Sequence, residues 1–141
     1  MLRRDAKVEL IKRVPLFAKC SKAELRRIAS IADEIDLAAG RVVIREGRRG
    51  SEFFVLIEGA VEVTAGEKRI RTLRGGDFFG EIALVSDLPR SATVTAATPL
   101  RVLVITRQGF RRLLEDSPGI QLKILQTLAE RLSQFAGVDR P

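Results

Sequence analysis

The part of the chain that decides its fold is the stretch FFGEIALVSDLPRSATV, residues 78–94. It places one acid, Glu81, and one arginine, Arg90, nine positions apart with mostly apolar residues between them. The stretch is too irregular for a single helix or strand. A carboxylate accepts hydrogen bonds from hydroxyl groups, and a guanidinium binds the oxygens of an anion. The stretch therefore predicts a binding site for a ligand with both hydroxyl groups and a negative charge.

The composition indicates one folded domain that binds rather than catalyses. The chain has 141 residues, 45% hydrophobic and 30% charged, which is typical of one domain with its own core. It has no histidine and one cysteine, Cys20, so Ser-His-Asp and Cys-His nucleophile systems and Cys/His zinc sites are excluded. No pair of acids lies where their pKa values would be pushed apart. We expect no enzymatic activity, no metal and no other cofactor.

The net charge of +7 is spread along the sequence in short groups. Tyrosine and tryptophan, which stack on bases, are absent, so we expect a solvated basic surface and no direct nucleic-acid binding. DNA binding through this charge stays open as an alternative, which would depend strongly on salt. The first ten residues lack the apolar core of a signal peptide, and no apolar run approaches the roughly 18 residues that span a bilayer. We expect a cytoplasmic protein.

Helical spacing gives way to strand spacing along the first two thirds of the chain. Apolar residues recur at helical intervals before Pro15, and Ser21 with Glu24 has the form of a capping box. These features predict helices within residues 1–34. Short apolar runs separated by glycines and turn residues predict antiparallel strands over residues 35–106.

The last part of the chain is again predicted to be helical, over residues 107–136. Thr106 can cap a first short helix, and Ser117 followed by Pro118 combines an N-cap with a proline at the first helical position. We therefore expect an α+β domain, mainly β, in which helices from both ends flank a β-sandwich or barrel.

Residues 78–84 and 89–94 resemble the phosphate-binding cassette of cyclic nucleotide-binding domains. Strand-turn glycines at 40, 47, 50 and 59 lie where that family has its own, and the resemblance covers nearly the whole chain. It is similar to sensor domains of bacterial cyclic nucleotide-gated channels and of catabolite-activator-type regulators. The resemblance implies a single domain over residues 1–141 with a jelly-roll-like β-roll of eight strands, a short cassette helix and a C-terminal helical lid. It implies cyclic AMP (cAMP) or cyclic GMP (cGMP) as the ligand.

The polar residues of the cassette are implied to hold the sugar and the phosphate. Glu81 would accept a hydrogen bond from the ribose 2′-hydroxyl, and Arg90 would bind the phosphate oxygens. Ser91 could add a hydroxyl donor, or be an ordinary residue at the start of a strand. Glu81 and Arg90 could alternatively form a plain structural ion pair.

Small and apolar residues are implied to complete the site. Gly80 would let the backbone approach the sugar, or serve only as a turn glycine. The N–H groups of Ile82 and Ala83, at the start of the cassette helix, would point at the phosphate. Val63 and Leu73 would form an apolar wall for the base and ribose, and each could equally belong to the core.

Two residues of the last helix match positions that cover the base in activator-type members. Arg131 could stack on the base or bond to it, or be a solvated helix residue. Phe135 could stack on the purine, or pack against other apolar groups, including those of a second copy in a homodimer. Ser91 stands where several cGMP-binding members have a threonine, so we expect cAMP rather than cGMP.

The resemblance implies a sensor whose ligand shifts the population of helix positions. The phosphate would order the cassette around Arg90, which would favour an inward position of the C-terminal helix. One alternative is an interaction module of the same fold that has lost its ligand. Another is a fragment of a DNA-binding regulator or of an ion channel or transporter. The effector domain or protein is not specified by the sequence.

Overall fold

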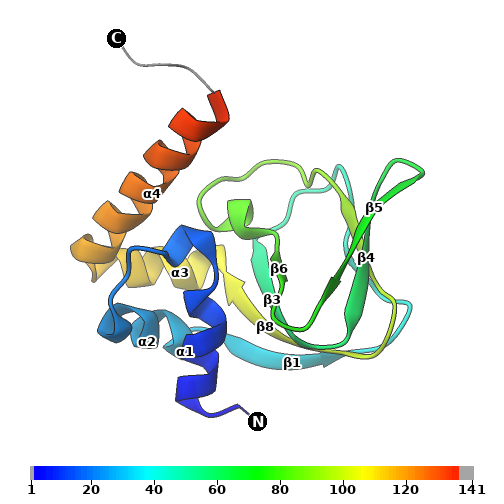
Figure 1. The fold of residues 1–141 in the computed structure, drawn as a ribbon, viewed down its shortest axis with the longest axis horizontal. Helices are drawn as coiled ribbons and strands as arrows, with labels where there is room; N and C mark the ends of the chain where they lie inside the picture. Colours follow the sequence, from blue (N-terminus) through cyan, green and yellow to red (C-terminus); the bar gives the residue numbers. More distant parts are fainter. Residues whose placement is uncertain (1, 137–141) are drawn as a thin grey trace.

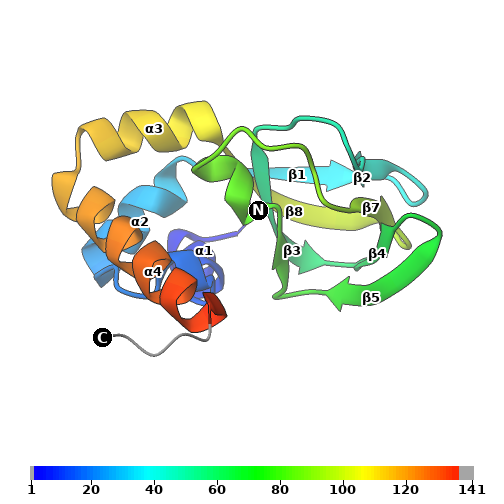
Figure 2. The ribbon, with the colours of Figure 1, turned by 90° about the horizontal axis from the view of Figure 1, so that it is seen from above.

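The computed structural model describes residues 2–136, with Phe135 and Ala136 described by their backbone alone. A helical half and a β-roll lie side by side, and helices from both ends of the chain share the helical half (Figure 1). The view from above shows the same division (Figure 2). The helices are α1 (Arg4–Lys12), η1 (Pro15–Phe17), α2 (Lys22–Ser30), α3 (Arg107–Glu115) and α4 (Pro118–Ala136).

The β-roll consists of two four-stranded antiparallel sheets with strand orders β1-β8-β3-β6 and β2-β7-β4-β5. This arrangement confirms the predicted α+β, mainly β, jelly-roll-like fold. A short 3-10 helix, η2 (Glu81–Leu84), lies between β6 and β7. The strands are β1 (Asp33–Leu37), β2 (Val42–Ile44), β3 (Glu52–Glu58), β4 (Ala60–Ala65), β5 (Lys68–Arg74), β6 (Phe78–Phe79), β7 (Thr93–Ala96) and β8 (Leu100–Thr106).

The first strand starts earlier than the sequence predicts. Strand β1 begins at Asp33, whereas the change from helix to strand was expected after residue 34. Only Leu37 of this strand is buried, and Ile35 is 38% exposed. The strand opens with two acids, Asp33 and Glu34, so the sequence does not mark its start, which is held by antiparallel pairing with β8.

Two of the three predicted side-chain caps are confirmed. Ser21 and Glu24 form the capping box, with N···O distances of 3.2 and 2.8 Å, and Thr106 accepts from the N–H of Gly109 at 3.1 Å. Ser117 precedes α4 as expected, but its buried Oγ has no hydrogen-bond partner among the described residues. Ser117 does occupy the predicted N-cap position, since its carbonyl oxygen accepts the first backbone hydrogen bonds of α4, but its side chain makes no capping bond among the described residues.

Two apolar clusters stabilise the halves and fix the cassette between them. In the helical half, Phe17 lies against Phe53 and Phe110, with ring centroids 6.3 and 5.8 Å apart. In the roll, Phe54 stacks on Phe79 at 5.1 Å. Burial of each such ring contributes roughly 1.5–3 kcal/mol. Strand β3 contributes to both clusters, so it joins the two halves rigidly.

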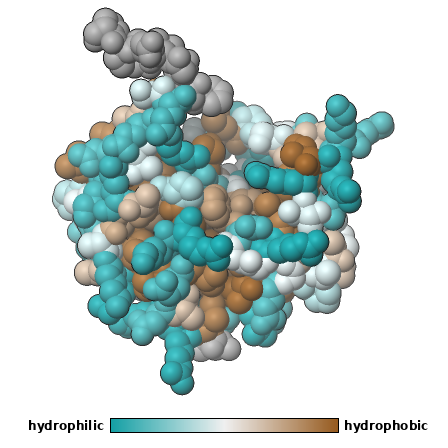
Figure 3. All heavy atoms as spheres, in the orientation of Figure 1, coloured by the Kyte–Doolittle hydropathy of each residue, from teal (hydrophilic) through white to brown (hydrophobic). Residues whose placement is uncertain are grey.

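On the face seen in Figure 3, hydrophilic side chains cover most of the rim, and many of the apolar side chains lie toward the middle. None of the helices within residues 2–136 could span a bilayer.

Candidate ligand-binding site

A cavity of about 490 Å³ lies within the roll beside η2. Pockets of roughly 300–1,000 Å³ accept small organic ligands. The cavity beside η2 is lined by eight of the ten predicted site residues, namely Val63, Leu73, Gly80, Glu81, Ile82, Ala83, Arg90 and Ser91. The other lining residues are Ile44, Arg71, Phe78, Phe79, Leu88, Pro89, Ala92 and Val94.

The Arg90 side chain is held by backbone oxygens and is only 10% exposed. Its Nη2 donates to the carbonyl of Glu52 at 2.7 Å, its Nη1 lies 3.5 Å from the carbonyl of Gly80, and the Glu52 carboxylate is 3.8 Å away. Burial lowers the pKa of Arg90, the Glu52 carboxylate opposes this shift, and the cation Arg107 adds to it. A guanidinium has five N–H donors, so this buried cation keeps donors for an anion in the cavity.

Two glycines make room for the Arg90 guanidinium. A Cβ on Gly50 would lie 2.6 Å from Arg90 Nε, and one on Gly80 would lie 3.0 Å from Nη1. Gly80 also has a φ of +83°, which favours glycine, so its role as a turn glycine is met as well. Side chains at these two positions would push Arg90 out of its place.

Glu81 presents a buried carboxylate oxygen without a donor. Its side chain is 13% exposed, and Oε1 lies 3.3 Å from Nη1 of Arg131. Its Oε2 is buried and has no hydrogen-bond partner among the described residues. A buried acceptor left unpaired is costly, and a hydroxyl group would satisfy it. Arg90 is paired with Glu52, so the alternative of a Glu81–Arg90 ion pair is not what the structure shows.

The short helix η2 offers fewer free backbone donors than predicted. The N–H of Ala83 already donates to the carbonyl of Gly80 at 3.2 Å, because η2 is a 3-10 turn. The expectation that this N–H is free for a phosphate was therefore wrong for the structure as it stands. Ile82 is 49% exposed beside the cavity, and Ser91 is an exposed lining residue.

The apolar wall comes from β4 and β5. Leu73 is 8% exposed, belongs to the core of the roll and lines the cavity, so its place in the core is confirmed, while its contact with the base and ribose stays a prediction. Val63 packs against the same cluster. Arg71 also lines the cavity and was missed, although its spacing of two from Leu73 on one strand could have revealed it.

Arg107, the first residue of α3, is a second residue that the sequence did not reveal. Its Nε donates to the carbonyl of Ala83 at 2.6 Å, and its Nη2 donates to the carbonyls of Gly50 at 2.8 Å and Ser86 at 3.3 Å. The side chain is 14% exposed. It thereby fastens the cassette to the end of β8, and it touches both the cassette helix and the loop that seats Arg90.

Helix α4 contacts the cassette through Arg131. Arg131 is 42% exposed and bonds to Glu81, so it is not a fully solvated helix residue, and its expected contact with the base stays a prediction. The side chain of Phe135 lies outside the described residues, so its expected place over the base stays a prediction.

The first half of α4 is anchored to the helical core. Ile120 and Ile124 are buried at 1% and 4% exposure. Lys123 pairs with Glu24 of α2, the same residue that closes the capping box. The contact with the cassette is therefore made by the less buried second half of the helix.

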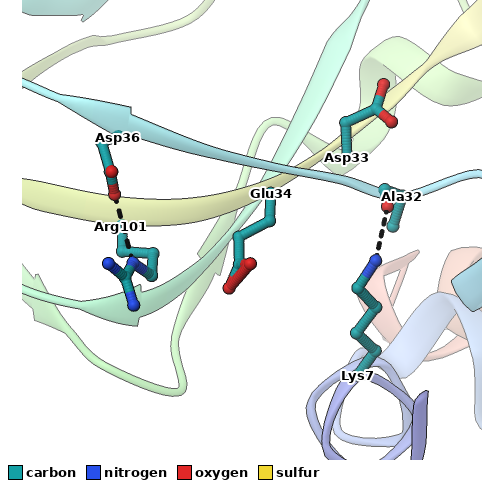
Figure 4. A pocket seen from close by; sticks show the side chains of 6 residues that line it. All are labelled: Lys7, Ala32, Asp33, Glu34, Asp36 and Arg101. Atoms are coloured by element: carbon teal, nitrogen blue, oxygen red, sulfur yellow. Dashed lines mark hydrogen bonds and ion pairs between the residues drawn. The ribbon is translucent and has the colours of Figure 1, made fainter. Parts of the chain in front are cut away.

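A second cavity, of about 460 Å³, lies between α1 and β1 (Figure 4). Both of its basic side chains are engaged with nearby protein groups: Arg101 donates to Asp36 at 3.1 Å, and Lys7 donates to the carbonyl of Ala32 at 3.1 Å. None of the predicted site residues lines it. We therefore assign the functional site to the cavity in the roll.

Comparisons with known proteins agree with this geometry. A family model for the cyclic nucleotide-binding domain matches residues 34–117. The cAMP-dependent protein kinase regulatory subunit of Mycosarcoma maydis is 41% identical over 116 residues, which cover 76% of this chain and 22% of that protein. A cyclic nucleotide-gated potassium channel of Rhizobium etli is 39% identical over 123 residues, or 87% of this chain and 34% of the channel.

A solved structure gives the same result for the fold. The N-terminal domain of a transcriptional regulator from Streptomyces coelicolor A3(2) superposes with a TM-score of 0.84 at 25% identity. The match covers 94% of this chain and 98% of that domain. The chain thus spans only about a fifth to a third of the two curated relatives but nearly the whole of this domain. With the cassette, the fold and the family model in agreement, the chain belongs to the cyclic nucleotide-binding domain family.

Proposed function

We propose that this domain is a sensor that binds a cyclic nucleotide, cAMP in preference to cGMP. The observation that carries the proposal is the pairing, in one cavity, of a buried guanidinium with free donors and a buried carboxylate oxygen without one. A cyclic nucleotide supplies the counterpart of each, a phosphate anion and a ribose 2′-hydroxyl.

The remaining groups account for the rest of the ligand. Arg90 binds the phosphate with help from Ser91, Glu81 takes the 2′-hydroxyl, and Val63 and Leu73 face the sugar and base. The preference for cAMP is supported by the serine at position 91 and by the fungal relative, whose name describes it as cAMP-dependent.

The signal passes to α4 through a shared carboxylate. Arg131 contacts Glu81 Oε1, while the ligand hydroxyl binds the same group at Oε2. Nucleotide binding therefore changes the energy of the contact between α4 and the cassette, and a ligand with different affinity for two helix positions shifts their populations. We place Phe135 in this moving segment as part of the cover over the base.

The exposed side of α4 supports a homodimer as the output. Leu122, Leu125 and Leu132 are 54%, 64% and 69% exposed, and with Ala129 they follow alternating spacings of three and four residues. Such spacing forms the seam of a coiled coil. In this proposal residues 1–141 form a single domain that performs no catalysis. The domain acts in the cytoplasm and reports to an effector of unspecified kind.

Calorimetric titration with cAMP tests the proposal. We expect saturable binding to the natural chain, a loss of at least about a hundredfold in Arg90→Ala, and unchanged binding in the control Arg111→Ala on exposed α3 surface. Absence of binding at millimolar cAMP would instead favour a ligand-free interaction module. Salt-dependent DNA binding that ignores cAMP would favour the nucleic-acid alternative.

A further inference from the structure

The second sheet of the roll ends in an uncovered strand. Strand β5 is last in the order β2-β7-β4-β5, and Figures 1 and 2 both show it at the outer rim of the roll. It has seven residues, whereas the edge strands β2 and β6 have three and two. Within residues 2–136, β4 is the only element that lies close along it. We call this strand, residues 68–74, the β5 edge.

Hydrogen bonds at the end of β5 show which of its backbone groups point away from the sheet. The N–H of Arg74 donates to the Asp77 carboxylate at 2.9 Å, and its C=O accepts from the N–H of Asp77 at 2.9 Å. These two groups are therefore not directed at β4. Outward groups alternate along a strand of an antiparallel pair, so the N–H and C=O of Thr72 also point to the free edge. No described residue outside β4 bonds to them, so they are open to another extended chain.

The side chains of the β5 edge carry one sign of charge. Four of its seven residues are lysine or arginine, and none is acidic. Lys68, Arg69 and Arg74 are exposed. Arg69 has a loose ion pair with Glu62 at 3.7 Å, whereas the structure between residues 2 and 136 shows no ion pair of the Lys68 or Arg74 side chains. A partner that lies along this edge therefore meets cations that are free to bind acids.

An apolar side chain stands among these cations. Ile70 is 55% exposed, and it has no pairing partner on β4, because the register passes directly from Val63–Arg71 to Thr64–Arg69. Bulges and charges on an edge strand hinder the pairing of identical copies. Like charges opposite each other are unfavourable, so two β5 edges repel, while an acidic strand is attracted.

The acidic edge strand β1 of a second copy is a poor occupant, because its acids are already engaged. Asp36 accepts from Arg101 at 3.1 Å, and Glu34 accepts from the N–H of Leu2 at 3.2 Å. Nucleic acid would use the charge but not the free N–H and C=O groups or the isoleucine. The edge therefore fits an extended polypeptide with acidic side chains.

We infer that the β5 edge is a docking surface for an acidic, extended segment of another protein, which adds to the sheet as a fifth strand. The backbone of the segment bonds to Thr72, its acids lie against Lys68 and Arg74, and an apolar side chain packs on Ile70. The surface needs no bound nucleotide, so the inference goes beyond the proposed function.

Anisotropy of a fluorescein-labelled peptide of alternating glutamate and valine, at low salt, tests the charge requirement. We expect saturable binding that weakens at least about tenfold in the double variant Lys68→Glu with Arg74→Glu, because attractive pairs become repulsive. The double variant Arg26→Glu with Arg111→Glu changes the net charge equally on exposed helix surface, and it should bind within about twofold of the natural chain. A peptide of alternating lysine and valine should not bind.

Two changes to the backbone test the added strand. The acidic peptide with all its amides N-methylated keeps the charges but cannot donate to a sheet edge, and it should bind at least about tenfold more weakly. Thr72→Pro removes the outward N–H, which an edge strand tolerates, and should also weaken the peptide. Thermal melting controls for folding, and the N-methylated peptide measures the same bonds on the natural chain if Thr72→Pro is unstable.

Four results would overturn the inference. They are the absence of saturable binding, equal binding of the N-methylated or the lysine peptide, displacement of the peptide by duplex DNA, and self-association of the natural chain that is lost in Lys68→Glu with Arg74→Glu. The last two would assign the edge to nucleic acid or to a second copy. If the natural chain binds the peptide but not cAMP, the proposed function fails and this inference stands.

Discussion

The unpaired oxygen of Glu81 allows its role to be measured atom by atom. We expect Glu81→Ala to weaken cAMP binding but to leave the binding of 2′-deoxy-cAMP nearly unchanged. The deoxy ligand lacks the hydroxyl that would donate to Oε2, so protein and ligand each lose one half of the same hydrogen bond. The two changes form a double-mutant cycle, which isolates the pairwise energy.

The size of the effect follows from the burial of the carboxylate. The Glu81 side chain is 13% exposed, and Arg131 contacts its other oxygen at 3.3 Å. A hydrogen bond to a charged group shielded from water contributes about 1.5–3 kcal/mol. Because each 1.4 kcal/mol is tenfold in affinity, cAMP should bind about 10- to 100-fold more tightly than 2′-deoxy-cAMP to the natural chain. In Glu81→Ala this ratio should fall to about one.

Competition against a fluorescent cAMP analogue gives the four dissociation constants. Thermal melting without ligand controls for folding, and Glu115→Ala at the exposed end of α3 serves as a matched loss of one acid. A ratio near one in the natural chain, or a ratio that survives in Glu81→Ala, would show that the hydroxyl binds elsewhere.

Three further outcomes are expected. Arg107→Ala removes the bonds that fasten the cassette, so titration should show cAMP affinity reduced about tenfold, whereas Arg111→Ala should not differ from the natural chain. Gly80→Ala, strained at its φ of +83° and close to Arg90, should melt earlier and bind more weakly. The hydrogen bond from Lys123 lowers the pKa of Glu24. The ionised Glu24 therefore stabilises the fold fully above its ordinary pKa, and this stabilisation is lost as the pH falls through the lowered pKa. The melting temperature should drop more between about pH 6 and about pH 3 in the natural chain than in Glu24→Gln.

The sequence was informative where the determinants are local. The capping box at Ser21 and the strand VVI at 42–44 were predicted because their signals lie within a few residues. Glu81 and Arg90 were predicted for the same reason, since both lie in a single short stretch, and the cavity contains both.

What the sequence could not supply depends on contacts between distant segments. The partner of Arg90 is Glu52, 38 positions away, and Arg107 reaches Gly50 across 57 positions. Neither contact can be deduced from the spacing of residues along the chain, because both depend on the pairing of β3 with β6 and β8. The first two residues of strand β1 escaped detection in the same way, as their place is fixed by the pairing with β8 rather than by their own pattern.

Because α4 is buried at its start and more exposed toward its end, a small tilt at its buried end would move the other end by several ångströms. Its first turns are held by the buried Ile120 and Ile124, while among the described residues the part beyond Leu128 is held by two ion pairs, Glu130 with Lys19 and Arg131 with Glu81. With a rise of about 1.5 Å per residue, the stretch from Leu128 to the end of the helix is roughly 12 Å long. A tilt of about 20° at the fulcrum would carry its tip through about 4 Å. In the proposed sensor, such a tilt would convert a change at one carboxylate into a displacement of several ångströms at the end of the helix.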